Sequence, residues 1–215
     1  PGGELARRAA LPLLLAGFAW LALIPGPGDP DVFMHLAYGR WIAAHGELPV
    51  HDPFSSFGEG KVALAYSWPF QLGFFEAARA GGWVGVQLAK VVLILGVALA
   101  LVRLVERLEP RATRGLPLVA LGLIGYMGSL SPRPWLLSIG FLLIELEVVL
   151  EARRSGNARR LAWLVPLFAA WANVHVQFVY GLGVLGCAAL EALVEQARGQ
   201  ETGGPPARAW WLALG

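Results

Sequence analysis

Two carboxylates and a histidine follow the first apolar segment of the chain, in the stretch GDPDVFMH. Asp31 and His35 are four residues apart, so both lie on one face of a helix that starts here. The dipole at a helix N-terminus favours the ionised form of Asp31, which is the form that a general base needs. Asp29 is a preferred N-cap residue, and Pro30 suits the first helical position. Capping alone accounts for Asp29, and the dipole alone accounts for Asp31, so each acid has a structural reading beside the catalytic one.

Two basic residues are candidates for binding a phosphate. Arg133 lies in the short turn SPRPW, and its guanidinium fork matches phosphate oxygens. An arginine anchored at a membrane interface explains the same residue. Lys90 lies inside an apolar run, where an ionisable side chain is costly and usually functional. Its long side chain could instead extend outward to the interface.

Other polar residues interrupt apolar sequence at two further places. Asp52 precedes a proline in the first long loop, and an acid there is equally typical of a turn. His35 lies in the same loop. Asn173, His175 and Gln177 alternate with valines between two apolar runs. Such a polar break is tolerated where it lines a cavity, and it also fits a simple turn. We interpret these five side chains as candidate substrate-binding residues.

Other kinds of chemistry have no support in the sequence. It contains no P-loop, no dinucleotide-binding fingerprint, no nucleophile elbow and no zinc-ligand spacing. Four glutamates near predicted helix ends lie close to arginines, so we interpret them as solvated or paired surface charges. These glutamates are Glu145, Glu147, Glu191 and Glu195.

The composition shows what kind of structure must position these residues. Of the 215 residues, 56% are hydrophobic and only 15% are charged, whereas globular domains average about 25% charged. The mean hydropathy is +0.57, which predicts a membrane protein. The net charge of +2 is spread over short loops rather than one stripe, which excludes nucleic acid as a partner. One cysteine, Cys187, excludes a disulfide framework.

Apolar runs predict an all-α, polytopic transmembrane bundle of about six spans. We expect one membrane domain over 1–215. The predicted spans are 9–24, 83–102, 116–130, 135–150, 161–172 and 178–194, with 208–215 as the start of a further one. Because the chain opens with PGG and stops within RAWWLALG, we also expect it to be an N-terminal piece of a longer protein.

The segment 25–82 is too long for a simple connection and predicts two interfacial helices. The first runs from Asp29 to about Ala44 and ends near Gly46. Its residues Phe33, Ala37, Trp41 and Ala44 share one face, which could lie on the bilayer. The second starts near Ser67 and ends at the glycines before Trp83.

Basic residues predict which side of the membrane each loop faces. Twelve lie in alternate loops and four in the intervening ones, and positive charge collects in cytoplasmic loops. The N-terminus is therefore predicted to be cytoplasmic, in a multi-pass protein of the plasma (inner) membrane. All the candidate loops that carry polar residues then face the extracytoplasmic side.

The first long loop contains DPDVFMHLAYGRWIAAHGELPVHDPFSS, then YSWPFQ and GGW. These segments resemble the first extracytoplasmic loop of the GT-C membrane glycosyltransferases, which include protein O-mannosyltransferases and aminoarabinose transferases. Two later segments, RPWLLSIGFLLIELEVVLEARR and LVPLFAAWANVHVQFVYGLG, look like later parts of bacterial members. The resemblance runs from about Leu11 to Gly183.

This resemblance implies that an acid just after the first span is the catalytic base. The spacing to Gly46 fits Asp31 better than Asp29, but the assignment stays open between them. The implied reaction transfers sugar from a polyprenyl-phosphate carrier to a glycan, lipid or protein acceptor outside the cytoplasm, with no required cofactor. Arg133, with Lys90 or His175, would hold the phosphate.

Two alternatives stay open. Oligosaccharyltransferases, a more distant branch, hold a divalent metal with an acid at this place, so a metal near Asp29 and Asp31 is an alternative to the metal-free reading. A non-enzymatic polytopic transport or scaffold protein, or an inactive relative, is the alternative function. A transporter should show repeated halves or broken helices, and no clear internal repeat is present.

Overall fold

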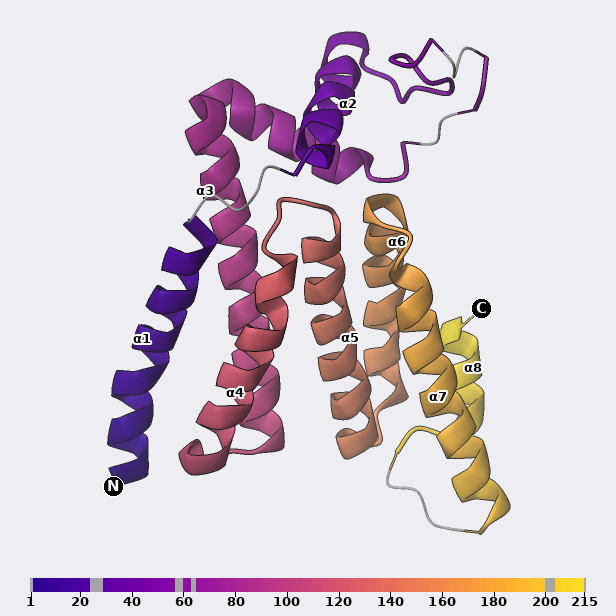
Figure 1. Ribbon diagram of the computed structural model, residues 1–215. Helices are drawn as coiled ribbons and strands as arrows, with labels where there is room; N and C mark the ends of the chain where they lie inside the picture. The colour runs from indigo at the N-terminus through magenta and orange to yellow at the C-terminus, as the bar shows by residue number, and fades with distance from the viewer. Residues whose placement is uncertain (1, 24–28, 57–59, 63–64, 200–203, 215) are drawn as a thin grey trace. The chain divides into compact units, whose positions relative to one another are not determined.

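The computed structural model describes residues 2–23, 29–56, 60–62, 65–199 and 204–214. Within these ranges the chain is mainly helical (Figure 1). The β-structure there is one isolated antiparallel bridge between His51 and Val62. The predicted all-α class is thus confirmed. The elements are α1 (Gly2–Leu23), α2 (Asp31–His45), α3 (Trp68–Leu108), α4 (Ala112–Tyr126), η1 (Met127–Ser129), α5 (Trp135–Ser155), η2 (Ala158–Trp163), α6 (Leu164–Val174), α7 (Phe178–Ala197) and α8 (Ala207–Leu214).

The chain divides into two compact units, Pro1–Leu137 and Ser138–Gly215, and each is described by itself. Residues 24–28, where the first span was predicted to end and the first loop to begin, lie outside the described residues. The same holds for residue 215 at the end of the last predicted segment.

Two helices in the described part of the chain, α3 and α7, are long and apolar enough to cross a membrane. Ala9–Leu23 and α4 are apolar but shorter. The predicted span 161–172 begins instead as the 3-10 turn η2, and α6 starts only at Leu164. Pro166 explains this start, because a proline is tolerated in the first turn of a helix and not further inside it.

Helix α2 follows the predicted interfacial helix closely. It ends at Gly46, whose φ of 69° is the left-handed conformation that favours glycine. Its buried residues Val32, His35, Gly39 and Ile42 form one side, and α2 packs against α3 (Figure 1). At Gly39 the α2 backbone comes so close to the Gln71 carbonyl that any side chain would collide with it.

Helix α3 is two helices joined at a kink. Gly81 and Gly82 have non-helical backbone angles, and φ at Gly82 is 57°. The arm before the kink is the predicted second interfacial helix, and the arm after it is the predicted span from Trp83. This second arm continues to Leu108, six residues beyond the predicted end. The kink is tight, because a side chain at Gly85 would collide with the Ala77 carbonyl.

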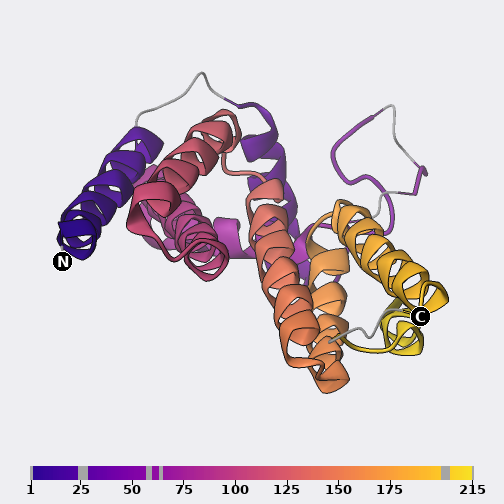
Figure 2. The same ribbon diagram turned by 90° about the horizontal axis from the view of Figure 1, so that it is seen from below.

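In the first unit α1 packs on both α3 and α4, and α3 also packs on α4 (Figure 2). Phe18 of α1 and Tyr126 of α4 have ring centroids 5.7 Å apart in this contact. Where α2 meets α3, Val32, Phe70, Phe74 and Val86 form a buried cluster. This packing sets the start of α2 against the second arm of α3.

In the second unit α7 packs on α6 and α8, and α8 also packs on η2. The buried core is rich in alanine and leucine, and Trp210 of α8 is 1% exposed within it. Arg153 of α5 pairs with Glu191 and Glu195 of α7. The predicted pairing of these two glutamates with a basic residue is therefore confirmed.

Candidate functional site

An open cleft of about 750 Å³ lies in the first unit, between the start of α2, the second arm of α3 and the turn before α5. Two predicted site residues from distant parts of the sequence, Asp29 and Arg133, line it together with Lys90. The fold therefore brings an acid and two basic residues to one cavity. Ala22 at the end of α1 and Leu130 after η1 belong to its apolar wall.

Asp29 is bound on both carboxylate oxygens. Arg133 donates from Nε to Oδ2 and from Nη2 to Oδ1, each at 2.5 Å, and the hydroxyl of Ser131 donates to Oδ2. The backbone N–H of Asp31 donates to Oδ1 at 3.1 Å. The Arg133 hydrogen bonds are the main reason that the pKa of Asp29 is lowered to about 2, against the opposing effect of burial. Conversely, the bond to Asp29 raises the pKa of Arg133.

The predicted N-cap role of Asp29 holds only in part. The helix begins at Asp31, and Pro30 occupies the cap position without a side-chain hydrogen bond. Asp29 still accepts from the first helical N–H, although most of its hydrogen-bonding capacity goes to Arg133 and Ser131. The helix therefore starts one residue later than expected.

The carboxylate of Asp31 has fewer polar contacts than the carboxylate of Asp29. Its Oδ2 lies 2.7 Å from Arg133 Nη1, and its side chain is 43% exposed, compared with 12% for Asp29. It stands in the first turn of α2, where the helix dipole favours an anion. One carboxylate oxygen of Asp31 is therefore left for a substrate, whereas both oxygens of Asp29 are used.

Lys90 carries the uncompensated positive charge of the cleft. It is 5% exposed, it lines the cleft, and no acid among the described residues forms an ion pair with it. One helical turn earlier, Gln87 also lines the cleft, and its buried Oε1 has no hydrogen-bond partner within the described chain. Arg133, by contrast, faces two carboxylates, so the group of Asp29, Asp31 and Arg133 has a formal charge of −1.

Aromatic side chains also line the cleft. The rings of Phe33 and Trp83 are stacked with centroids 6.2 Å apart, and both residues line the cleft. The guanidinium carbon of Arg133 lies 4.8 Å from the ring centroid of Trp135. Trp83, Gln87 and Ser131 were not among the predicted site residues, because their place at the cleft depends on the kink of α3 and on the turn before α5.

No family model, no curated protein and no solved structure matches this chain. The site's own residues therefore carry the functional argument.

Three predicted site residues of the first unit do not line the cleft: Asp31, which contacts Arg133 instead, and His35 and Asp52. His35 is 8% exposed, its ring lies edge-on to Phe70, and Gln71 Nε2 is 3.5 Å from His35 Nδ1. Asp52 accepts from the backbone N–H groups of Phe54 and Ser55, at 3.0 and 3.3 Å. His35 therefore packs between α2 and α3, and Asp52 stabilises a turn.

The remaining predicted residues belong to the second unit. Asn173 is exposed and donates to the Ala169 carbonyl at 2.8 Å. His175 Nδ1 lies 3.0 Å from the Ser138 hydroxyl, which also accepts from Trp171 Nε1 at 3.0 Å. Burial lowers the pKa of His175, and a hydrogen bond with Gln177 opposes that shift. Ser138 and Trp171, which the sequence did not single out, thus fix the position of His175.

The metal alternative does not fit the described residues. No group of three or more His, Cys, Asp or Glu side chains comes together among them. Asp29 and Asp31 are instead bridged by the guanidinium of Arg133. A divalent cation would have to compete with that positive charge, so the arrangement does not favour a metal.

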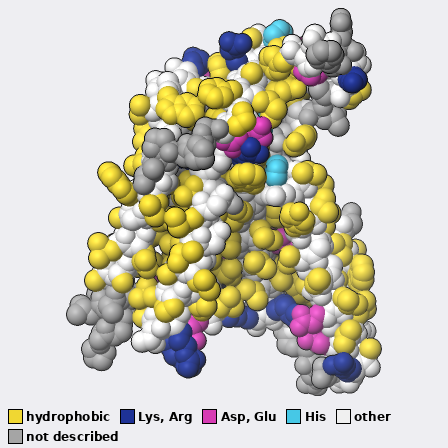
Figure 3. Space-filling model, in the orientation of Figure 1, with side chains coloured by type: hydrophobic (Ala, Val, Ile, Leu, Met, Phe, Trp, Pro, Cys, Tyr) yellow, Lys and Arg dark blue, Asp and Glu magenta, His cyan; other side chains and the backbone are white. Residues whose placement is uncertain are grey.

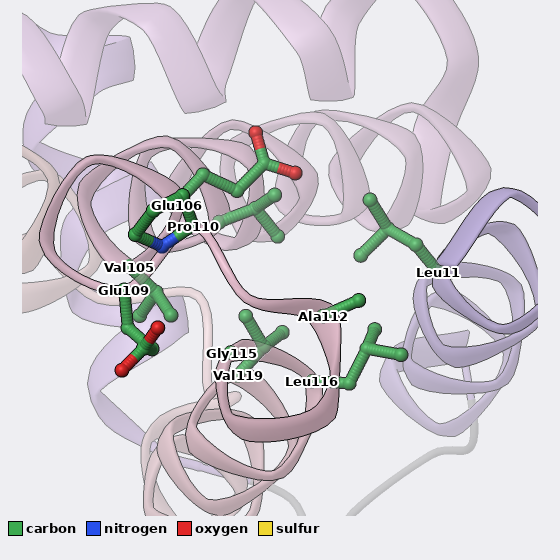
Figure 4. A pocket seen from close by; sticks show the side chains of 10 residues that line it. Leu11, Val105, Glu106, Glu109, Pro110, Ala112, Gly115, Leu116 and Val119 are labelled. Carbon is green, nitrogen blue, oxygen red and sulfur yellow. The ribbon is translucent and has the colours of Figure 1, made fainter. Parts of the chain in front are cut away.

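A second, much smaller cavity of about 20 Å³ lies at the turn between α3 and α4 (Figure 4). Leu11 and Leu116 point toward it from α1 and α4. Glu109 also lines it, but its carboxylate lies 3.7 Å from nitrogens of both Arg111 and Arg114. The volume suits one water molecule at most, so this cavity is no candidate for a substrate.

Proposed function

We propose that this protein transfers a sugar from a polyprenyl-phosphate carrier to a hydroxyl group of an extracytoplasmic acceptor. The observation that carries the proposal is the cleft of about 750 Å³, which Arg133 and the buried Lys90 line. Asp31 does not line it, but its carboxylate lies 2.7 Å from the Arg133 guanidinium. A glycosyl transfer from a lipid phosphate needs a base and a cation close to one cavity. The resemblance of the first loop to GT-C glycosyltransferases supports the same reaction.

In the proposed reaction the carboxylate of Asp31 takes the proton of the acceptor hydroxyl. The acceptor oxygen attacks the anomeric carbon and forms the new glycosidic bond. The bond from that carbon to the phosphate oxygen breaks with inversion. Its electron pair stays on that oxygen, so the leaving group is the polyprenyl phosphate. Lys90 stabilises the negative charge on the leaving phosphate, and Arg133 holds Asp31 in place.

A membrane location is part of the proposal. Hydrophobic side chains are spread over the helix surfaces visible in Figure 3, and many large ones are exposed, such as Leu13 at 73% and Leu212 at 81%. A large exposed apolar surface suits contact with lipid. We further propose the predicted bundle of about six spans in the plasma (inner) membrane, with a cytoplasmic N-terminus. The sidedness of the basic loops supports this orientation.

The test is a transfer assay in membranes that contain the full-length protein. Radiolabelled polyprenyl-phosphate sugars are supplied, and transfer to endogenous acceptors is compared between the wild type and Asp31→Asn. We expect Asp31→Asn to lose about 10²–10⁴-fold in transfer rate, and Asp52→Asn to retain activity because Asp52 stabilises a turn. Equal transfer by the wild type and Asp31→Asn would refute the base assignment. No transfer from any donor would favour the transport or scaffold alternative.

A further inference from the structure

Glu145 is a fully buried acid in the middle of α5. It was predicted to be a surface charge near a helix end, and this prediction is wrong. Its exposed fraction is 0%, and neither carboxyl oxygen has a hydrogen-bond partner among the described residues. It stands ten residues from each end of α5, which is about 15 Å along a helix. No side chain of the described chain forms an ion pair with it. Arg153, near the end of α5, pairs with glutamates of α7, and Arg160 of η2 pairs with Glu151.

The carboxyl group lies in a closed apolar pocket between three helices. A methyl group at Gly181 of α7 would lie 2.6 Å from Glu145 Oε2, 2.7 Å from Trp171 Cζ3 and 2.9 Å from Phe168 Cε1. Gly181 is therefore the residue that lets α7 approach the acid. None of these three neighbours ionises, and they leave no room for an organic ligand.

Such a site selects the neutral carboxylic acid. An ionised carboxylate is strongly disfavoured without water, a counter-ion or hydrogen-bond donors. Ionisable residues inside apolar helix bundles are costly and are functional by default. A group that is closed off in this way has space for a proton and for nothing larger.

We propose that Glu145 is a proton-binding site, in which the neutral acid allows α7 to pack closely on α5 at Gly181. Ionisation requires water at the carboxylate, and water can reach it only if α7 separates from Trp171 and Phe168. Proton release and loosening of α7 are thus one event. The inference does not depend on sugar transfer, since Glu145 belongs to the second unit and the proposed reaction uses residues of the first.

The titratable group connected to this packing is His175. It is linked through the Ser138 hydroxyl to the indole N–H of Trp171, the side chain that covers Gly181 and the acid. At the far end of α5 and α7, Arg153 joins Glu191 and Glu195. The variant His175→Gln distinguishes a pH effect that comes from His175 from one that comes from Glu145.

Infrared spectroscopy of the full chain in detergent at neutral pH tests the proposal. A protonated carboxylic acid has its own carbonyl stretching band, which shifts in D₂O. We expect this band in the wild type, in His175→Gln and in Glu151→Gln, which is the matched control on the same helix. We expect the Glu145→Gln variant to lack it. Identical spectra for the wild type and Glu145→Gln would overturn the proposal.

A further variant keeps the test decisive if Glu145→Gln does not fold. In Gly181→Ala the displaced acid reaches water, so the carbonyl band should lose intensity at neutral pH. An unchanged band would refute the role of Gly181.

Discussion

Arg133 binds the carboxylate of Asp29 through two nitrogens, each at 2.5 Å, across 104 residues of sequence. A third nitrogen of the same guanidinium lies 2.7 Å from Asp31. This one side chain joins the turn before α5 to the start of α2, and it balances one of the two negative charges there. Asp31 is thereby left as the acid that can act on a substrate.

Loss of the Asp29 carboxylate should destabilise the first unit. In Asp29→Asn, Arg133 loses a bidentate partner that is largely buried, which we expect to lower the free energy of unfolding by about 1–3 kcal/mol. Thermal unfolding in detergent, followed by near-ultraviolet circular dichroism, measures the change. Asp52→Asn serves as the control at an exposed turn, and an equal loss in both variants would contradict the special role of the Arg133 contact.

The contact between Arg133 and Asp29 should also make the free energy of unfolding depend on pH in acid. The pKa of Asp29 is about 2 in the folded chain and near its ordinary 3.8 in the unfolded chain. As the pH falls below about 4, the unfolded chain therefore binds the proton first, and about 1–2 kcal/mol of stability is lost by about pH 2. This acid-dependent loss should be absent from Asp29→Asn. Parallel acid profiles for variant and wild type would show that another group dominates.

Lys90 should determine the affinity for a lipid phosphate. The variant Lys90→Met removes the cation of the cleft that forms no ion pair within the described residues, and we expect about 10–100-fold weaker binding of polyprenyl phosphate. Isothermal titration calorimetry in detergent measures the dissociation constant. The matched control is Lys61→Met, which changes the other lysine of the chain, an exposed one. It should bind polyprenyl phosphate like the wild type. A similar loss in both variants would indicate non-specific attraction between charges.

The end of α6 should loosen in mild acid. Burial lowers the pKa of His175 in the folded chain, so the unfolded chain binds its proton first as the pH falls through about 6.5. The stabilisation is complete above that value and decreases below it. Hydrogen–deuterium exchange, corrected for intrinsic rates, should therefore quicken near Val174 and Phe178 at lower pH in the wild type but not in His175→Gln. His51→Gln, at an exposed histidine, should behave as the wild type does.

The contact between α2 and α3 should be sensitive to one methyl group. In Gly39→Ala the new carbon would lie 2.6 Å from Phe75 Cβ and closer still to the Gln71 carbonyl. We expect a loss of about 1–3 kcal/mol in the free energy of unfolding, because backbone atoms cannot move aside easily. Gly73→Ala is the matched control on α3, where no atom lies within 4 Å; it should be neutral or stabilising by about 0.5–1 kcal/mol. Thermal unfolding would contradict the expectation if both alanines had the same effect.

The sequence by itself determined the local features of this protein. The all-helical class follows from its long apolar runs. The end of α2 at Gly46 and the break of α3 at Gly81 and Gly82 follow from backbone angles that glycine adopts at little cost. The polar role of Asp52 in a turn also depends only on its neighbours in sequence.

Only the tertiary structure decided which of the predicted polar residues meet. Asp29 and Arg133 are 104 residues apart, and no local rule of spacing pairs them. His35 shares a helical face with Asp31 in sequence, yet packing against Phe70 and Gln71 turns it away from the cleft. Glu145 looked like a surface charge beside arginines, yet three helices enclose it. The physical reason is the same in each case: burial and ion pairing depend on contacts between helices, and those contacts are absent from the order of residues along any one helix.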